Sequence, residues 1–256
     1  MFLFRMVIKN LTRHKRRTLI TALIIAFAIL IYILIEGLMI GLTEESFGNI
    51  INLDSGHIQV TQEAYWEDRK ELPLEDLIVP SAEIENDIES LNQLEAYTQR
   101  LKFSGNLNHG IDELNVSGIG IDIGQDKNVF NLNQYIIEGR MPEKDSREII
   151  MGAKLAELME FNIGDYAIML IRTEEKTFNT IDGEIVGLFN TPHPTLNENS
   201  VYIPLATAQD SLNVENKISE YVLRLEDSDI ALTAAGSLSQ KLPSSLKAYN
   251  WKQSAE

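Results

Sequence analysis

A hydrophobic stretch runs from Leu19 to Leu42 and contains no Lys, Arg or Asp. A helix rises about 1.5 Å per residue and the hydrocarbon core of a bilayer is about 30 Å thick, so about 20 apolar residues cross it. The pattern predicts a transmembrane helix over residues 18–42. Phe47, Ile50 and Ile51 keep the helical spacing beyond it, which predicts a helical stalk over residues 43–53.

Residues 1–17 mix apolar and basic positions, which predicts a short amphipathic, basic segment on the inner membrane surface. A plain positively charged leader region is the alternative interpretation. Cleavage of a signal peptide after Ala26-Phe27-Ala28 is a further alternative, but that triplet lies inside the apolar run, and signal-peptide cores are only about 7–15 residues long.

After the stalk, the pattern changes to short strands and amphipathic helices. The order strand, helix, strand occurs over residues 54–104 and recurs over residues 217–251. Two such β-α-β halves commonly close into one antiparallel α/β sandwich. The spacing therefore predicts an α+β fold, with a porter-like α/β subdomain formed by 54–104 plus 217–251.

Residues 105–216 predict an inserted, β-rich subdomain, because alternating segments are separated by turn residues such as Gly164-Asp165. Short helices are expected over 153–159 and 205–212, and a longer helix over 227–242. The expected strands of the insert are Leu114 to Ile123, Arg147 to Met151, Tyr166 to Ile171, Phe178 to Phe189 and Ser200 to Ile203.

Charge is distributed very unevenly along the chain. The first 17 residues carry six of the 22 Lys and Arg and no acid, whereas 16 bases and 37 acids follow from Thr43 onward. Basic flanks stay in the cytoplasm. Arg13, Lys15, Arg16 and Arg17 are therefore predicted to anchor the topology, which places the head outside the cytoplasm at a bacterial cytoplasmic membrane.

Three residues of the apolar stretch indicate contact with other helices. Glu36 is its only ionisable group, and a carboxylate is costly inside a bilayer unless it faces protein, water or the interface. Gly37 and Gly41 form a G-x-x-x-G pair, which lets helix backbones approach closely. Together they predict helix packing in the membrane; a Glu36 side chain that reaches the outer interface is the alternative.

The composition excludes several kinds of chemistry. The chain has no Cys, so thiolate catalysis and Cys-ligated metals are excluded, and its four His residues lack metal-ligand spacing. No phosphate-binding G-x-x-x-x-G-K-[ST] loop and no G-x-S-x-G elbow occur. With a net charge of −16 a nucleic-acid partner is not expected. We expect no catalytic residues, no metal and no cofactor.

Several segments, taken in order, resemble the FtsX-like and MacB-type permeases of ABC transporters, most closely those of lipoprotein-releasing systems. The resemblance covers nearly the whole chain and ends near Trp251. The segments that carry it are Val7 to Leu19, Ser55 to Val60, Ile137 to Pro142, Glu148 to Ala156, Gly164-Asp165, Val186 to Phe189 and Val201 to Gln209.

The resemblance implies a permease with four spans, a large extracytoplasmic domain after the first span, dimerisation with an identical or different permease, and a separate cytoplasmic ATPase. The sequence stops at Glu256, where the family enters its second span, so a fragment of a longer protein is expected. The connection Arg172 to Thr177 is shorter than the protruding loop of chaperone-docking members. Pro192, His193 and Pro194 are the alternative candidate contact loop, and a rigid exposed turn is the simpler interpretation.

The resemblance leaves three functions open. The first is export or release of lipoproteins or other amphiphiles. The second is transmission of ATPase motion to an extracytoplasmic partner such as a cell-wall hydrolase, without transport. The third is a membrane-anchored binding head that works without an ATPase. The sequence itself does not identify the substrate.

Overall fold

The computed structural model describes residues 15–110 and 112–254. The chain divides into two compact units, Met1–Gly48 and Asn49–Glu256. Most of the predicted segment over residues 1–17, Arg13 included, therefore lies outside the described residues.

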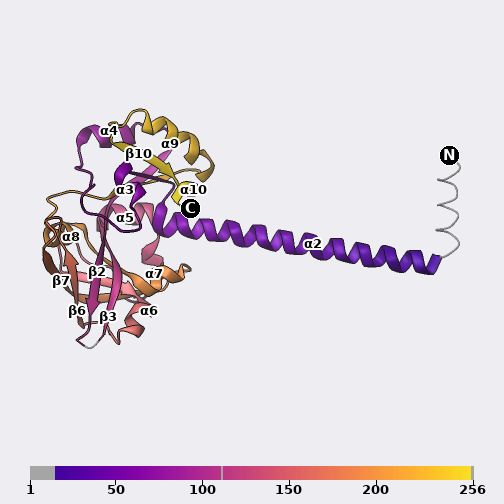
Figure 1. The fold of residues 1–256 in the computed structure, drawn as a ribbon, viewed down its shortest axis with the longest axis horizontal. Coiled ribbons are helices and arrows are strands. Elements are labelled where there is room, and N and C mark those ends of the chain that lie inside the picture. Colours follow the sequence, from indigo (N-terminus) through magenta and orange to yellow (C-terminus); the bar gives the residue numbers. More distant parts are fainter. Residues whose placement is uncertain (1–14, 111, 255–256) are drawn as a thin grey trace. The chain divides into compact units, whose positions relative to one another are not determined.

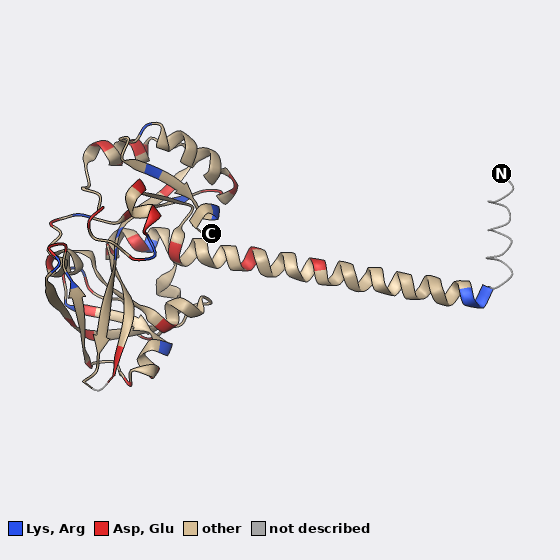
Figure 2. Ribbon diagram, in the orientation of Figure 1, with Lys and Arg blue, Asp and Glu red and all other residues tan. Residues whose placement is uncertain are grey.

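Helix α2 (Lys15–Ile50) contains the predicted span and continues without a break through its 36 residues. Including the π-helical turn η1 (Ile51–Ser55), the most apolar part of this helical run has a mean hydropathy of 2.9. Length and composition make it a candidate membrane helix. Figure 2 shows basic residues at the start of α2 and both acidic and basic residues in the unit that contains the sheets.

The predicted split β-α-β arrangement is confirmed. Strands β1 (Ile58–Gln62), β9 (Glu220–Leu225), β2 (Leu94–Asn108) and β10 (Leu246–Asn250) lie in the order β10-β1-β9-β2, with every neighbouring pair antiparallel. Hence β1 runs parallel to β2 with β9 between them, and β9 runs parallel to β10 with β1 between them. Helices α4 (Ala82–Glu89) and α9 (Ala231–Ser239) are the crossovers, and the Ser81 side chain caps α4 by accepting a hydrogen bond from the Ile84 amide.

The β-rich part is a closed ring of strands. In order, each pairing with the next, they are β2, β3 (Glu113–Ile121), β8 (Ser200–Pro204), β5 (Glu148–Gly152), β7 (Phe178–Phe189) and β6 (Tyr166–Arg172), and β6 pairs back to β2. Strand β4 (Ile136–Gly139) adds to β7 outside the ring. Helices α6 (Ala153–Leu158) and α8 (Leu205–Leu212) match the expected positions.

Strand β2 belongs to both parts of the head. Its first half pairs with β9 and its second half with β3 and β6 (Figure 1). Leu101 and Phe103 enter the interior of the ring, where they pack with Met169, Ile181 and Ile203. The division at residues 104 and 105 therefore falls inside one continuous strand; the two subdomains remain a proposal.

The ring interior depends on a small residue opposite a large one. Phe103 pairs in register with Gly118 on β3. A Cβ added at Gly118 would lie 2.2 Å from the Phe103 ring, so only glycine leaves room for that ring.

The sequence missed several short elements. They are α3 (Glu63–Glu67), α5 (Ile123–Val129), the 3-10 turn η2 (Leu132–Tyr135), β4, α7 (Pro194–Asn199) and α10 (Trp251–Ser254). The expected strand Leu114 to Ile123 stops at Ile121, because Asp122 caps α5 by accepting hydrogen bonds from the amides of Gly124 and Gln125. The expected helix over 227–242 is two pieces, η3 (Ser228–Ile230) and α9.

The candidate contact loop Pro192, His193 and Pro194 leads directly into a helix that was not expected, α7, which begins at Pro194. Asn197 is buried and fixes this segment, since its side chain accepts a hydrogen bond from the Thr191 amide at 2.8 Å and donates to the Thr191 carbonyl at 2.7 Å. Helix α7 is thereby held against the preceding connection.

A fully buried ion pair joins β2 to α5. Arg100 donates from Nε and Nη2 to the two oxygens of Asp126, at 2.8 and 3.0 Å, and neither side chain is appreciably exposed. The guanidinium also lies 3.5 Å from the centre of the Phe130 ring. Burial opposes the charge on Arg100, but Asp126 outweighs it and raises the pKa of the guanidinium.

We expect Asp126→Ala to lower the free energy of unfolding by about 3–5 kcal/mol, because it leaves Arg100 charged and buried without a counterion. Denaturant unfolding of the detergent-solubilised chain, followed by Trp fluorescence, measures this. The double variant Arg100→Met with Asp126→Leu is the control, and it should lose less than the single variant. An Asp126→Ala loss below ~1 kcal/mol would contradict this account of the pair.

Candidate functional site

The candidate site lies where the chain passes from helix into sheet. Asn49, Ile50 and η1 belong to the same compact unit as the sheets. Ile51 and Leu53 are buried, and Leu53 packs in a second core cluster with Ile119, Phe189 and Tyr202. The beginning of this unit is thus fixed by apolar contacts to the outer side of the strand ring.

Gly56 makes the turn from η1 into β1. Its amide donates to the Ile51 carbonyl at 3.0 Å, and its φ of +60° is a conformation that glycine adopts without strain. A Cβ at this position would lie 2.4 Å from Cγ1 of Val222 and 3.0 Å from the carbonyl oxygen of Leu223. Both the backbone angle and the space therefore require glycine.

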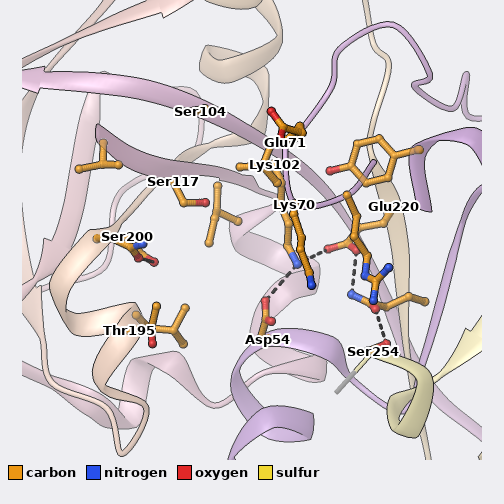
Figure 3. A pocket seen from close by; sticks show the side chains of 18 of the residues that line it. Asp54, Lys70, Glu71, Lys102, Ser104, Ser117, Thr195, Ser200, Glu220 and Ser254 are labelled. Atoms are coloured by element: carbon orange, nitrogen blue, oxygen red, sulfur yellow. Dashed lines mark hydrogen bonds and ion pairs between the residues drawn. The ribbon is translucent and has the colours of Figure 1, made fainter. Parts of the chain in front are cut away.

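A chain of polar contacts, the junction network, connects η1 to the sheet (Figure 3). Lys102 Nζ lies 3.0 Å from Asp54 Oδ1 on η1 and 3.0 Å from Glu220 Oε1 on β9. Gln59 on β1 donates to Glu220 Oε2 at 2.8 Å, and Ser254 on α10 donates to Gln59 Oε1 at 2.6 Å. The network thus connects η1, at the beginning of this unit, with α10, at its end, through residues of the central strands β2, β9 and β1.

Burial makes the network electrostatically strong. Glu220 is almost inaccessible and Lys102 is mostly covered, whereas Asp54 is 42% exposed. Burial raises the pKa of Glu220 above the usual carboxyl value, although Lys102 opposes this. Burial lowers the pKa of Lys102, but Asp54 and Glu220 outweigh it and raise that pKa overall. Lys102 therefore stays charged and holds two carboxylates that would otherwise repel each other.

The junction network forms one wall of a polar cleft of about 670 Å³. Trp66 and Lys70 line it from the α3 side, and His193 and Thr195 line it from the α7 side. Trp66 stacks on Tyr249 with ring centres 3.8 Å apart. Across residues 15–110 and 112–254, no group of three or more His, Cys, Asp or Glu side chains is arranged to hold a metal ion.

His57 follows the Gly56 turn and is buried. Its Nδ1 accepts a hydrogen bond from the Leu225 amide at 2.8 Å, while its own amide donates to Leu223 and its carbonyl accepts from Trp251. Burial, assisted by Arg224, lowers the pKa of the imidazole. His57 therefore joins β1, β9 and α10 as a neutral ring.

Of the described residues that were singled out from the sequence, one lines this cleft and the others lie outside it. Lys15, Arg16 and Arg17 begin α2, and Arg13 precedes the described residues. Glu36, Gly37 and Gly41 lie on α2 in the other compact unit, where nothing approaches a Cβ built at either glycine within 4 Å. Pro192 and Pro194 are exposed, and His193 lines the cleft. Their roles as anchor, packing and contact residues remain predictions.

Sequence reasoning missed Asp54, Lys102 and Glu220. These residues are separated by 48 positions and more along the chain, and no local motif connects them. The available signal was a lysine and a glutamate within strands, but β2 also buries Thr98 and Arg100, so this signal did not single out Lys102. Only the sheet order β1-β9-β2 brings them together.

Comparison with known proteins shows the family. A sequence model of the MacB-like periplasmic core domain matches residues 18–240. The chain therefore belongs to the MacB-like family of ABC transporter permeases, as the order of its motifs indicated. A family of this kind contributes a permease component rather than a catalytic one, and it generally dimerises and works with an ATPase partner.

Solved structures share the fold at low sequence identity. The periplasmic region of MacB from Actinobacillus actinomycetemcomitans is 14% identical, with a TM-score of 0.54, over 81% of this chain and 94% of that one. The extracellular domain of the noncanonic ABC-type transporter YknZ from Gram-positive bacteria is also 14% identical, with a TM-score of 0.52, over 76% of this chain and 100% of that one. No curated protein sequence matches significantly.

The close approach at Gly56 yields a prediction. Gly56→Ala should lower the free energy of unfolding by about 2–5 kcal/mol, because it adds a positive-φ cost to an overlap with Val222 and Leu223. Gly164→Ala is the matched control, since Gly164 has a φ of +91° but open space around its Cβ position. The control should lose only about 1–2 kcal/mol. Equal losses in denaturant unfolding would contradict the proposed crowding at Gly56.

The buried His57 yields a second prediction. Its folded pKa lies below the ordinary value of 6.5. At pH values between the two pKa values, the unfolded chain binds more protons than the folded chain. The contribution of His57 to the free energy of unfolding is therefore fully present above pH 6.5 and decreases as the pH falls toward the folded pKa. His57→Asn, whose amide oxygen can accept the Leu225 bond without titrating, should weaken this decrease. Unfolding at about pH 7.5 and pH 5 measures it, and the same pH dependence in both proteins would refute the role of His57.

Proposed function

We propose that this chain belongs to a permease subunit in a bacterial cytoplasmic membrane, with its N-terminus in the cytoplasm and its head outside. The basic residues at the start of α2 support this orientation. The apolar α2 helix ahead of a MacB-like periplasmic core domain supports the membrane anchor.

The function that we infer is coupling of ATP hydrolysis in a separate cytoplasmic ATPase to movement of the head. The observation that carries it is the junction network: Lys102 connects the helical turn η1 to the central strands β2 and β9. A displacement of η1 would act on the sheet through this ion pair and through buried Ile51 and Leu53. Coupling requires that two states of the head differ in their affinity for substrate or partner.

Lipoproteins or other amphiphiles are the proposed substrates, on the strength of the motif resemblance to lipoprotein-releasing permeases. A second candidate is transmission of ATPase motion to an extracytoplasmic partner such as a cell-wall hydrolase. The junction network is compatible with both functions, because each requires a mechanical connection between helix and head. The third candidate, an anchored binding head without an ATPase, does not require such a connection.

Further partners follow from the same proposal. Glu36, Gly37 and Gly41 would contact the helices of a second permease subunit, identical or different, within the lipid bilayer. The open space around both glycines is compatible with close helix packing. Pro192, His193 and Pro194 remain a candidate contact segment for an extracytoplasmic protein or lipoprotein.

Asp54→Ala tests the coupling role. It removes the contact between η1 and β2 but leaves the buried pair of Lys102 and Glu220 intact, so the head should stay folded. The full-length permease with its ATPase, reconstituted in vesicles, should release a fluorescently labelled triacylated lipoprotein at least about fivefold less per ATP hydrolysed.

The matched control is Glu63→Ala, which removes an ion pair with Lys247 at another place on the same sheet. It should leave release per ATP unchanged. Unchanged release in Asp54→Ala would refute the coupling role. If the unmodified protein releases no lipoprotein but activates a peptidoglycan hydrolase in an ATP-dependent manner, the second candidate function is correct.

A further inference from the structure

One outer face of the strand ring is apolar and uncovered among residues 15–110 and 112–254. Strand β6 alternates buried and exposed positions, and its exposed positions include Tyr166, Ile168 and Leu170, at 67%, 50% and 40% exposure. Phe178 on β7 is 74% exposed. We call these four residues the β6 apolar face.

Strand register makes this face continuous. Leu170 lies opposite Thr180, so Phe178 is its diagonal neighbour, within reach of an aromatic side chain. Successive outward positions along β6 are two residues apart and share one side of the sheet. Among the other exposed large apolar residues of the head, Leu114 lies on β3 and Ile137 on β4, whereas Leu158 and Leu232 lie on helices α6 and α9.

Another part of the outer side of the ring is covered. Ile119 on β3, Ile150 on β5 and Tyr202 on β8 point outward into the second core cluster, where Leu53 and Leu132 cover them. No described element does the same for β6. Contiguous exposed apolar groups of this kind, bordered by polar residues, are typical of protein interaction sites.

The border of the face carries an excess of negative charge. Asn108, Ile168 and Asp182 form one row across three strands, and Glu184 lies opposite Tyr166. Glu113 lies opposite Asn108 on the far side. The bases are Arg172, opposite Phe178, and Arg147, which is 3.5 Å from Asp182. Three carboxylates, those of Glu113, Asp182 and Glu184, therefore border the face against two guanidinium groups.

We propose that the β6 apolar face docks an extracytoplasmic protein whose contact surface is apolar at its centre and carries Lys and Arg at its border. The acidic border opposes an isologous contact with a second copy, because like charges would meet. It equally opposes adsorption to anionic lipid. This inference rests on the proposed function in one respect, the location of the head outside the cytoplasm.

The test uses the full-length protein in intact cells, with photo-reactive benzoylphenylalanine replacing Tyr166. A second protein with the same probe at Leu232, which is equally exposed on α9, gives the background. The expected result is an adduct with one extracytoplasmic protein, formed at a peptide that contains Lys or Arg. Adduct yield should fall about tenfold with the double variant Ile168→Ser and Phe178→Ser.

Charge is tested separately. Asp182→Lys with Glu184→Lys should reduce the same adduct by about tenfold, whereas Leu232→Ser should leave it unchanged. All substituted side chains are at least partly exposed, so melting temperatures should match the unmodified protein and loss of the fold should not explain a lower yield.

An adduct with a second copy, an adduct with lipid, or a yield no higher than at Leu232 would each overturn the proposal. Protease accessibility of the head in cells and in inverted vesicles distinguishes failure of the docking proposal from failure of the proposed function. If the head is cytoplasmic, the proposed function fails as well. If the head is outside and no adduct forms, only the docking proposal fails.

Discussion

The head depends on one ammonium group placed between two carboxylates. Lys102 brings η1 and β9 to the same point on β2, and without it Asp54 and Glu220 would repel each other next to an apolar core. A buried charge of this kind is tolerated only when its counterions are in place. The backbone geometry around it is correspondingly fixed, because the Gly56 turn, the His57 hydrogen bonds and the packing of Leu53 all occur within a few residues of Asp54.

Strand β2 joins the split β-α-β part of the head to the closed ring of strands. Its residues alternate between the ring interior, which receives Leu101 and Phe103, and the opposite side, which carries Arg100 and Lys102. Arg100 pairs with Asp126 and fixes α5, whereas Lys102 fixes η1. Both ionic contacts therefore depend on the same strand, and its direction follows from pairing with β9 at one end and with β3 and β6 at the other.

Much of this fold could be predicted from the sequence, because its signals are local. The long apolar run predicted α2, and the period-two alternation predicted most strands of the ring. Of the features that escaped prediction, some have competing local signals and others depend on distant partners. Helix α5 looked like the end of a strand, since its cap at Asp122 competes with a run of alternating residues, and α7 looked like a loop because Asn197 stabilises it through contacts within the connection. The junction network escaped because its partners are distant: Asp54, Lys102 and Glu220 meet only after the strands have found their order.

The same side of β2 connects the junction network with the β6 apolar face. Lys102 and Asn108 are six positions apart and therefore point to one side of the strand, about 20 Å from each other at a rise near 3.3 Å per residue. Asn106 and Asn108 pair directly with Leu170 and Ile168 of that face. Strand β2 is paired with β3 without interruption from Arg100 to Asn108, so a force applied at Asp54 would be carried along this ladder toward the docking face. Occupation of that face by a partner would in turn favour one position of η1, because coupling between two binding or contact sites is reciprocal.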